Sequence, residues 1–155
     1  MEYRLRRADP DDEDDLAHLK ELHKITFEDT APIKDDMGCI FTRGAWWLMH
    51  PVGHEDAPIA FCGVTPSTYG PTYTYLKRGG VLKEHRGQGL QRRLIRIREK
   101  WARSRGYEWM ITNTTNDNPA SANSMIAEGY RLFWPSVPWD MKTAVYLRKR
   151  LLQSQ

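Results

Sequence analysis

The chain has 155 residues, of which 40% are hydrophobic and 28% are charged, and its formal net charge of +3 is too small to imply a nucleic-acid partner by itself. This length suits one domain with a sizeable core, so we expect a single domain over residues 1–155. No run approaches the roughly 18 apolar residues of a membrane span, and Met1 to Arg7 has no apolar segment typical of a secretory signal. We therefore expect a cytoplasmic protein. Cys39 and Cys62 are far apart and form no CxxC pair, which disfavours zinc ribbons and disulfide scaffolds.

The first segments are typical of a strand followed by an acidic helix. Tyr3–Arg7 alternates apolar and basic residues, which predicts a strand. Asp9 is expected to cap the next helix, with Pro10 in its first position and acids through Asp15 at the positive end of the helix dipole. We interpret this acidic run as a solvated first turn rather than as a metal or partner site.

The middle of the chain is predicted to contain three strands. They follow an irregular segment at residues 31–44 and are expected at Trp46–Met49, Pro58–Val64 and Tyr73–Leu82. The pair Gly79-Gly80 inside the third strand predicts a bulge or a close backbone approach. His50, His54 and Asp56 have metal-like spacing, but we place them in a turn that lacks cysteines, so a surface turn is the favoured interpretation.

The remaining residues alternate between helices and strands. A helix is expected over Gly89–Arg105, with one apolar stripe formed by Leu90, Leu94, Ile97 and Trp101. The elements expected after it are a strand at Trp109–Thr114, a helix at Ala120–Glu128, and strands at Tyr130–Phe133 and Thr143–Leu151. This order predicts a mixed α/β domain.

The turn before the long helix is suited to a pyrophosphate. A helix N-terminus leaves about four backbone N–H groups without partners and carries roughly half a positive charge. Gly87 and Gly89 allow the backbone to approach an anion closely, and basic residues add charge at Arg86, Arg92 and Arg93. The Walker A string is absent, and Arg92 stands where the dinucleotide fingerprint needs its third glycine, so both common nucleotide motifs fail.

This segment resembles the GNAT superfamily of acyl-CoA-dependent acetyltransferases, whose loop reads [Q/R]-x-x-G-x-[G/A]. Arg86-Gly87-Gln88-Gly89-Leu90 fits that loop, and Gln91 stands where glycine or alanine is usual. Val81 is similar to the family's strand-end valine. Asn118, Ser121 and Gly129-Tyr130 are similar to its downstream asparagine and glycine-aromatic segment. The resemblance is specific over residues 75–133 and diffuse elsewhere.

The resemblance implies a fold and a reaction. The implied fold is a single α/β domain with a twisted, mixed and mostly antiparallel sheet that splays around its central strands and is flanked by about four helices. The implied activity is an N-acetyltransferase that moves an acetyl group from acetyl-CoA to a primary amine by direct transfer in a ternary complex, without a metal. The residues expected to contact the cofactor are Val81, Leu82, Lys83, Arg86, Gly87, Gln88, Gly89, Leu90, Gln91, Arg92, Asn118, Ser121 and Met125.

Both positions that usually carry catalytic side chains in this family hold other residues. Tyr75 stands where histone-type relatives have a base glutamate, and Met125 stands where many relatives have a tyrosine that protonates the leaving thiolate. Three interpretations remain open. The reaction proceeds with water and the intrinsic leaving ability of the thiolate, or Tyr75 or Tyr130 has a proton role, or the chain binds acyl-CoA without turnover.

Other features leave alternatives of their own. The resemblance implies that the last loop between strands borders the acceptor site, so Trp134 and Trp139 are expected to shape an aromatic-walled pocket for a small-molecule or peptide amine. Packing in the core or at a dimer contact is the competing interpretation. The basic helix is also compatible with nucleic acid, but no recognised motif accompanies its charge. The resemblance also makes residues 143–151 a candidate strand for a homodimer contact, because similar domains often dimerise through such end strands. His85 is either a phosphate contact or a plain loop residue.

Overall fold

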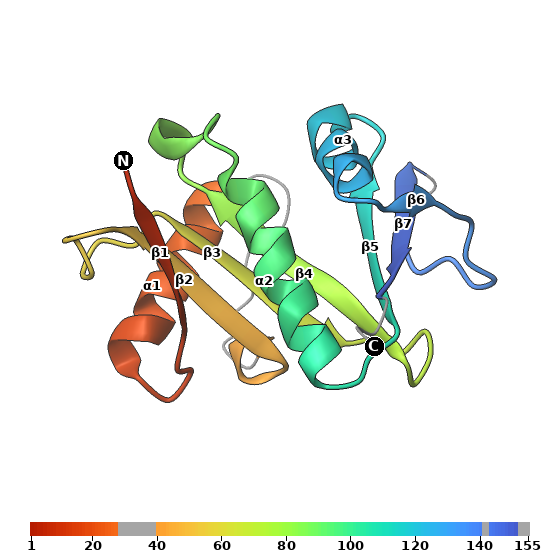
Figure 1. Ribbon diagram of the computed structural model, residues 1–155, viewed down its shortest axis with the longest axis horizontal. Coiled ribbons are helices and arrows are strands. Elements are labelled where there is room, and N and C mark those ends of the chain that lie inside the picture. Colours follow the sequence, from red (N-terminus) through yellow and green to blue (C-terminus); the bar gives the residue numbers. More distant parts are fainter. Residues whose placement is uncertain (28–39, 141–142, 152–155) are drawn as a thin grey trace. The chain divides into compact units, whose positions relative to one another are not determined.

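The computed structural model describes residues 1–27, 40–140 and 143–151 (Figure 1). Contacts between Cα atoms divide the chain into two compact units: Met1–Thr65 with Lys77–Leu94, and Pro66–Leu76 with Ile95–Gln155. We call them unit 1 and unit 2. The elements in chain order are β1 (Tyr3–Arg7), α1 (Glu13–Phe27), β2 (Ala45–Pro51), β3 (Ala60–Pro66), β4 (Tyr73–Val81), the 3-10 helix η2 (Lys83–His85), α2 (Leu90–Ser104), β5 (Trp109–Thr115), α3 (Pro119–Ala127), β6 (Arg131–Leu132) and β7 (Ala144–Arg150).

The strands form a mixed sheet in the order β1-β2-β3-β4-β5-β7-β6. The pairs β1–β2, β2–β3, β5–β7 and β6–β7 are antiparallel, whereas β4 runs parallel to β5. The register between β4 and β5 covers only the first residues of β4, from Tyr73 opposite Trp109 to Tyr75 opposite Ile111. The expected α/β class with a mixed, mostly antiparallel sheet is confirmed, and the described residues contain three α-helices.

Unit 1 has helices on both faces of its strands. Successive side chains of a strand point to opposite faces, and β3 shows this directly. Phe61 packs in a buried cluster with Leu19 and Leu22 of α1, whereas the Cys62 thiol lies 3.8 Å from the backbone oxygen of Leu94 in α2. Cys62 is buried and is not part of a disulfide within the described residues, and Cys39 lies outside them.

The start of α1 differs from the prediction. Asp12, not Asp9, caps the helix, because its carboxylate accepts from the Asp15 N–H at 3.0 Å. Asp9 instead holds a preceding turn through its carboxylate, which accepts from the Asp11 N–H. Asp15 also departs from a solvated first turn: it is buried and accepts two hydrogen bonds from Arg6, at 2.6 and 2.9 Å. The Arg6 guanidinium therefore holds the pKa of the Asp15 carboxyl below its usual value.

The buried face of α2 is wider and more polar than the apolar stripe predicted. Leu90 and Leu94 are buried as expected, whereas Ile97 and Trp101 are only half-buried. The buried positions also include Ile95, Arg98, Glu99 and Ala102. Hydropathy alone misses Arg98 and Glu99, because charged side chains are buried only when distant parts of the chain supply partners.

Two smaller predictions on unit 1 are settled by the structure. A β-carbon added at Gly80 would lie 2.7 Å from the Thr26 side chain of α1, which confirms a close approach at this glycine. His50 is not part of a turn, because it lies in β2 and is buried, with Nδ1 3.0 Å from the backbone oxygen of Pro51. Within the described residues, no cluster of His, Cys, Asp and Glu side chains is suited to hold a metal ion.

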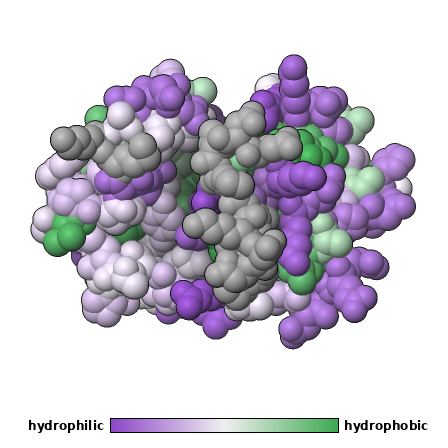
Figure 2. All heavy atoms as spheres, turned by 180° about the vertical axis from the view of Figure 1, so that it is seen from behind, coloured by the Kyte–Doolittle hydropathy of each residue, from purple (hydrophilic) through white to green (hydrophobic). Residues whose placement is uncertain are grey.

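One face of the molecule shows mainly polar side chains among the described residues (Figure 2). On the face shown in Figure 2, most of these side chains are hydrophilic and the hydrophobic ones form small, separate groups. The large hydrophobic residues that remain exposed include Leu132, Trp134, Val137 and Trp139. In the part of the chain that the structure describes, no helix has the length and apolar character needed to span a membrane.

Candidate active site

The glycine turn that we predict to be an anion cradle lies in unit 1 between β4 and α2. Gly87 and Gly89 both have left-handed backbone conformations, with φ of 81° and 75°. A β-carbon added at either glycine would meet no atom within 4 Å, so these positions need glycine for backbone conformation rather than for packing. At the start of α2, the Arg93 backbone N–H donates to the Gly89 carbonyl four residues earlier, at 3.4 Å. The N–H groups of Leu90 and Gln91 precede it, at the position where helices bind anions.

The cradle is tied to the end of β4. The Nε of Arg86 donates to the backbone oxygen of Val81 at 3.0 Å, so the loop closes back onto the strand-end valine. Leu82 donates its backbone N–H to Ile59, and Lys83 begins the short helix η2. The segment from Val81 to Arg92 is therefore closed at its start by the contact between Arg86 and Val81, and binding of a cofactor by its residues stays a prediction.

Tyr3 of β1 anchors this segment, and sequence analysis did not identify it. Its hydroxyl lies 2.8 Å from Nδ1 of His85 and accepts from the Gln88 side-chain amide at 3.1 Å. The guanidinium of Arg93 donates to the Tyr3 backbone oxygen at 3.1 Å. Because Tyr3 lies more than 80 residues before these partners, no local pattern indicates the contact. The contact with Tyr3 gives His85 a role in holding the loop. The sequence had suggested only a phosphate contact or a plain loop residue at this position.

The predicted cofactor residues of unit 2 lie on and before α3. The Asn118 side chain caps this helix by accepting from the Ser121 N–H at 3.3 Å, and Pro119 occupies the first turn. Asn118 is exposed, Ser121 is half-buried and Met125 is buried. Capping accounts for the asparagine structurally, and a contact with a cofactor stays a prediction for all three residues.

Tyr75 lies at a polar junction in unit 2. Its hydroxyl donates to the side-chain oxygen of Asn113 on β5, and the Trp139 indole N–H donates to the same oxygen at 2.9 Å. The Asn113 amide nitrogen donates to the Asp140 carboxylate, and the Asp140 backbone N–H donates to the Tyr146 hydroxyl at 3.0 Å. The sequence suggested Tyr75 and Trp139 separately, but nothing in it indicated that Asn113 joins them.

Aromatic rings surround this junction. The Trp139 ring lies 4.6 Å from that of Tyr146, 5.9 Å from Tyr69 and 6.4 Å from Tyr75, measured between centroids. Trp134 makes an edge contact with Tyr146 at 5.6 Å and is 70% exposed, while Trp139 is 39% exposed. Neither tryptophan is a core residue of the described unit, so the competing core interpretation is wrong for both.

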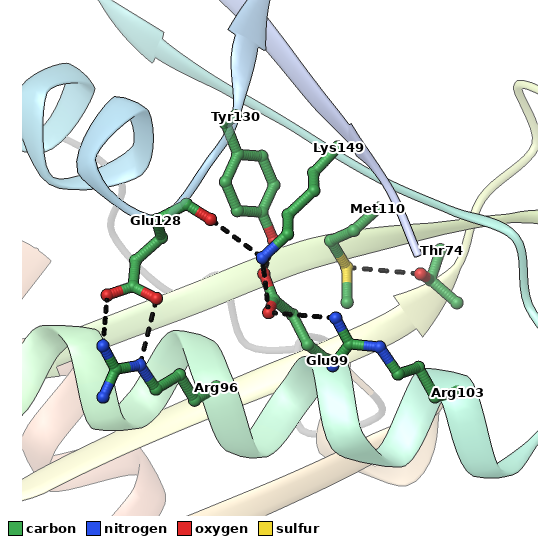
Figure 3. Close-up of polar contacts among 8 residues, drawn as sticks. All are labelled: Thr74, Arg96, Glu99, Arg103, Met110, Glu128, Tyr130 and Lys149. Atoms are coloured by element: carbon green, nitrogen blue, oxygen red, sulfur yellow. Dashed lines mark hydrogen bonds and ion pairs between the residues drawn. The ribbon is translucent and has the colours of Figure 1, made fainter. Parts of the chain in front are cut away.

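Tyr130 is buried in a second polar cluster of unit 2, shown in Figure 3. Its hydroxyl donates to the Glu99 carboxylate at 2.7 Å, and Lys149 donates to the same carboxylate at 3.0 Å. Lys149 also donates to the backbone oxygen of Glu128 at 2.8 Å. Burial, followed by the negative charge of Glu99, raises the pKa of Tyr130 well above its ordinary value. This geometry favours a structural role for Tyr130 over a proton role.

Replacing Tyr130 by phenylalanine tests that assignment. The variant removes one buried hydrogen bond to a charged group, so we expect the free energy of unfolding to fall by about 2 kcal/mol while turnover stays within about twofold. Urea unfolding and steady-state kinetics measure the two effects. A tenfold loss of rate at unchanged stability would instead support a proton role for Tyr130 in the reaction.

Several arginines of the basic helix have structural partners. Arg96 pairs with Glu128 at 3.0 Å, Arg103 lies 3.8 Å from Glu99, and Arg98 is buried. These contacts explain part of the positive charge of α2 through packing within unit 2.

Comparison with known proteins places these features in context. The model of the Acetyltransferase (GNAT) family matches residues 8–125. Among curated proteins, no significant match to this chain was found.

Solved structures share the fold over almost the entire chain. The ribosomal-protein-S18-alanine N-acetyltransferase from Escherichia coli has a TM-score of 0.74 at 13% identity, covering 99% of this chain and 97% of its own. The structure of yncA from Salmonella typhimurium with its cofactor acetyl-CoA has a TM-score of 0.72 at 15% identity, covering 100% and 97%. The GNAT domain of PAT from S. lividans has a TM-score of 0.75 at 17% identity, covering 96% and 90%. At these identities the likeness establishes the fold alone.

Proposed function

The chain belongs to the acetyltransferase (GNAT) family and is an acyltransferase, and we propose that it transfers an acetyl group from acetyl-CoA directly to a primary amine in a ternary complex. The single observation that carries this proposal is the glycine turn at the start of α2. Gly87 and Gly89 adopt left-handed conformations immediately before the helix N-terminus. Backbone N–H groups and the helix dipole then favour a pyrophosphate at this point.

The proposal gives each part of the described segment a task. Residues from Arg86 to Arg92 hold the pyrophosphate, and the backbone of Val81, Leu82 and Lys83 pairs with the pantetheine arm as an added strand does. Arg86 keeps the loop closed on the strand end through its bond to the Val81 oxygen. For unit 2, the family resemblance assigns cofactor contacts to Asn118, which caps α3, and to Ser121 and Met125 within that helix. Acetyl-CoA bound to the Salmonella yncA structure supports this choice of donor.

The chemistry requires a neutral amine and a good leaving group. A lysine-like amine with a pKa near 10.4 costs on the order of 4–5 kcal/mol to deprotonate at pH 7, so a proton acceptor or a water relay matters. A thiol with a pKa near 8.5 needs little help to leave as a thiolate. Met125 cannot donate a proton and is buried, which is compatible with departure of the thiolate without a protein acid.

One screen tests the proposed function. Acetyl-CoA consumption is measured against a panel of small amines, amino acids and peptides, and the thermal shift caused by CoA is measured on the same protein. We expect stabilisation by CoA and turnover with at least one amine class. Stabilisation without turnover on any amine would show an acyl-CoA-binding module, while retention on heparin without a CoA-dependent shift would favour nucleic acid.

Trp134 and Trp139 provide a further prediction about the acceptor. Because both side chains are exposed on one aromatic cluster, replacing both by alanine is expected to raise the acceptor KM about tenfold. The affinity for acetyl-CoA should stay unchanged, since the cradle lies on another segment. Steady-state kinetics with each substrate varied in turn measures the effect. An unchanged acceptor KM would show that neither tryptophan contributes to the acceptor pocket.

A further inference from the structure

We propose that Asn113 is a positioning residue that fixes the direction of the Tyr75 hydroxyl, so that Tyr75 presents oxygen lone pairs, and not its proton, to the acceptor amine or a water beside it. The inference rests on the proposed function. It replaces the proton role that the sequence left open for Tyr75 by a positional role, and it rests on contacts within unit 2 alone.

The argument begins with the orientation of the Asn113 amide. The oxygen and nitrogen of an asparagine amide differ in polarity, and their placement is decided by the surrounding partners. An indole N–H can only donate, so the atom of Asn113 that faces Trp139 at 2.9 Å must be the oxygen. A carboxylate accepts, so the atom facing Asp140 must be the amide nitrogen. Two independent partners therefore require the same orientation.

The orientation of the Asn113 amide determines the direction in which the Tyr75 hydroxyl proton points. The Tyr75 hydroxyl contacts the oxygen of Asn113, which has lone pairs and no hydrogen. The Tyr75 proton must therefore point toward Asn113, and the remaining lone pairs of the phenol oxygen point away from it. A hydroxyl held in this way accepts a hydrogen bond from an N–H or a water, and it does not protonate a leaving group without breaking its bond to Asn113.

A Tyr75 hydroxyl that presents lone pairs is suited to contact the acceptor amine during acetyl transfer. The amine nitrogen forms a bond to the thioester carbon, the carbon–sulfur bond breaks with its electron pair on sulfur, and the nitrogen releases one proton to water. A lone pair on Tyr75 that accepts an N–H of the amine orients the nitrogen for attack, which is a positional contribution. Tyr75 is then neither the base nor the acid of the reaction.

Asn113 also holds the loop before β7 in place. Trp139 and Asp140 lie next to each other in this loop and contact the two ends of the Asn113 amide. Tyr146 of β7, which pairs with Asn113 in register, accepts from the Asp140 N–H at 3.0 Å. The aromatic cluster and the Tyr75 hydroxyl are therefore positioned by the same amide.

A double-mutant cycle tests the inference. Tyr75→Phe and Asn113→Leu are each expected to lower kcat/KM for the acceptor about tenfold, with the KM for acetyl-CoA unchanged. The double variant should also lose about tenfold rather than a hundredfold, because the two side chains act as one unit. Tyr107, whose ring stacks on Trp101 with centroids 6.0 Å apart, provides the control variant Tyr107→Phe for loss of a tyrosine hydroxyl. A hundredfold loss in the double variant, or full activity of Asn113→Leu, would overturn the proposal.

An exchange of the two polar partners provides the conservative rescue. In the variant Asn113→Asp/Asp140→Asn, the carboxylate at position 113 still accepts from Tyr75 and Trp139, and the amide at position 140 donates to it. The direction of the Tyr75 proton is preserved, so kcat/KM for the acceptor is expected within about threefold of the wild type. Activity as low as that of Asn113→Leu would contradict the polarity argument.

Hydrogen exchange of the Trp139 indole N–H, assigned by comparison with Trp139→Phe, keeps the inference separate from the proposed function. Slow exchange in the wild type and fast exchange in Asn113→Leu support the junction, whereas equal rates overturn it. If the wild type acetylates no amine, the proposed function fails and the role of Tyr75 fails with it. If the wild type acetylates an amine, but the losses of the two single variants multiply in the double variant, only the inference fails.

Discussion

Replacing Gly87 and Gly89 together by alanine is expected to raise the Kd for CoA about a hundredfold, which corresponds to about 3 kcal/mol of binding free energy. Both residues have φ near 80°, a region that costs a residue with a β-carbon about 1–2 kcal/mol. The variant chain escapes this strain by relaxing the turn, and relaxation moves the backbone N–H groups away from the pyrophosphate. Isothermal titration calorimetry with CoA measures the loss, and the KM for acetyl-CoA should rise with it.

Gly106 provides a matched control for this prediction. It has φ of 81° and, like the cradle glycines, an added β-carbon would meet nothing within 4 Å. Gly106→Ala therefore imposes the same backbone strain at the end of α2, away from the cradle, and should lower stability while leaving the Kd for CoA unchanged. If Gly106→Ala and the double variant weakened CoA binding equally, the effect would be one of stability and the cradle assignment would be wrong.

Local patterns predicted most elements of the fold. Tyr3–Arg7 was predicted with the bounds that β1 has, and the ends of β4, α2 and β5 differ from the predictions by a residue or so. These elements carry their signals in neighbouring residues: alternation for strands, and glycine at the end of a helix. The cap of α1 was misplaced for a local reason, since Asp9 and Asp12 are both good capping residues and only the intervening turn decides between them.

The side-chain chemistry was less predictable, because its partners are distant in sequence. Glu99 is buried against Tyr130 and Lys149, which lie 31 and 50 residues later. Tyr75 and Asn113 are separated by 38 residues, and their contact depends on the parallel register of β4 with β5. A family resemblance supplies candidate positions such as Tyr75, but it says nothing about neighbours that are particular to this chain.

The stability of the protein is expected to fall by about 3 kcal/mol through His23 alone as the pH decreases from about 6.5 to 4. His23 lies in α1, is fully buried among the rings of Phe27, Phe41 and Phe61, and neither ring nitrogen has a hydrogen-bond partner within the described structure. Burial, and secondarily the positive charge of Arg78, lowers the pKa of His23 from 6.5 to about 4. Below pH 6.5 the unfolded chain binds a proton at this ring and the folded chain does not, so protonation favours unfolding.

Comparison of the wild type with His23→Leu isolates this contribution. Leucine removes two buried polar atoms without partners, so the variant should lose the pH dependence and should be at least as stable as the wild type at pH 7. Urea unfolding at several pH values from 7 to 4 gives the two free energies, and their difference should change by about 3 kcal/mol over that range. His54→Leu, at an exposed turn, is the control for removing a histidine. Parallel curves for wild type and His23→Leu would mean that the folded chain protonates His23 as readily as the unfolded chain does, which requires a partner or water at the ring.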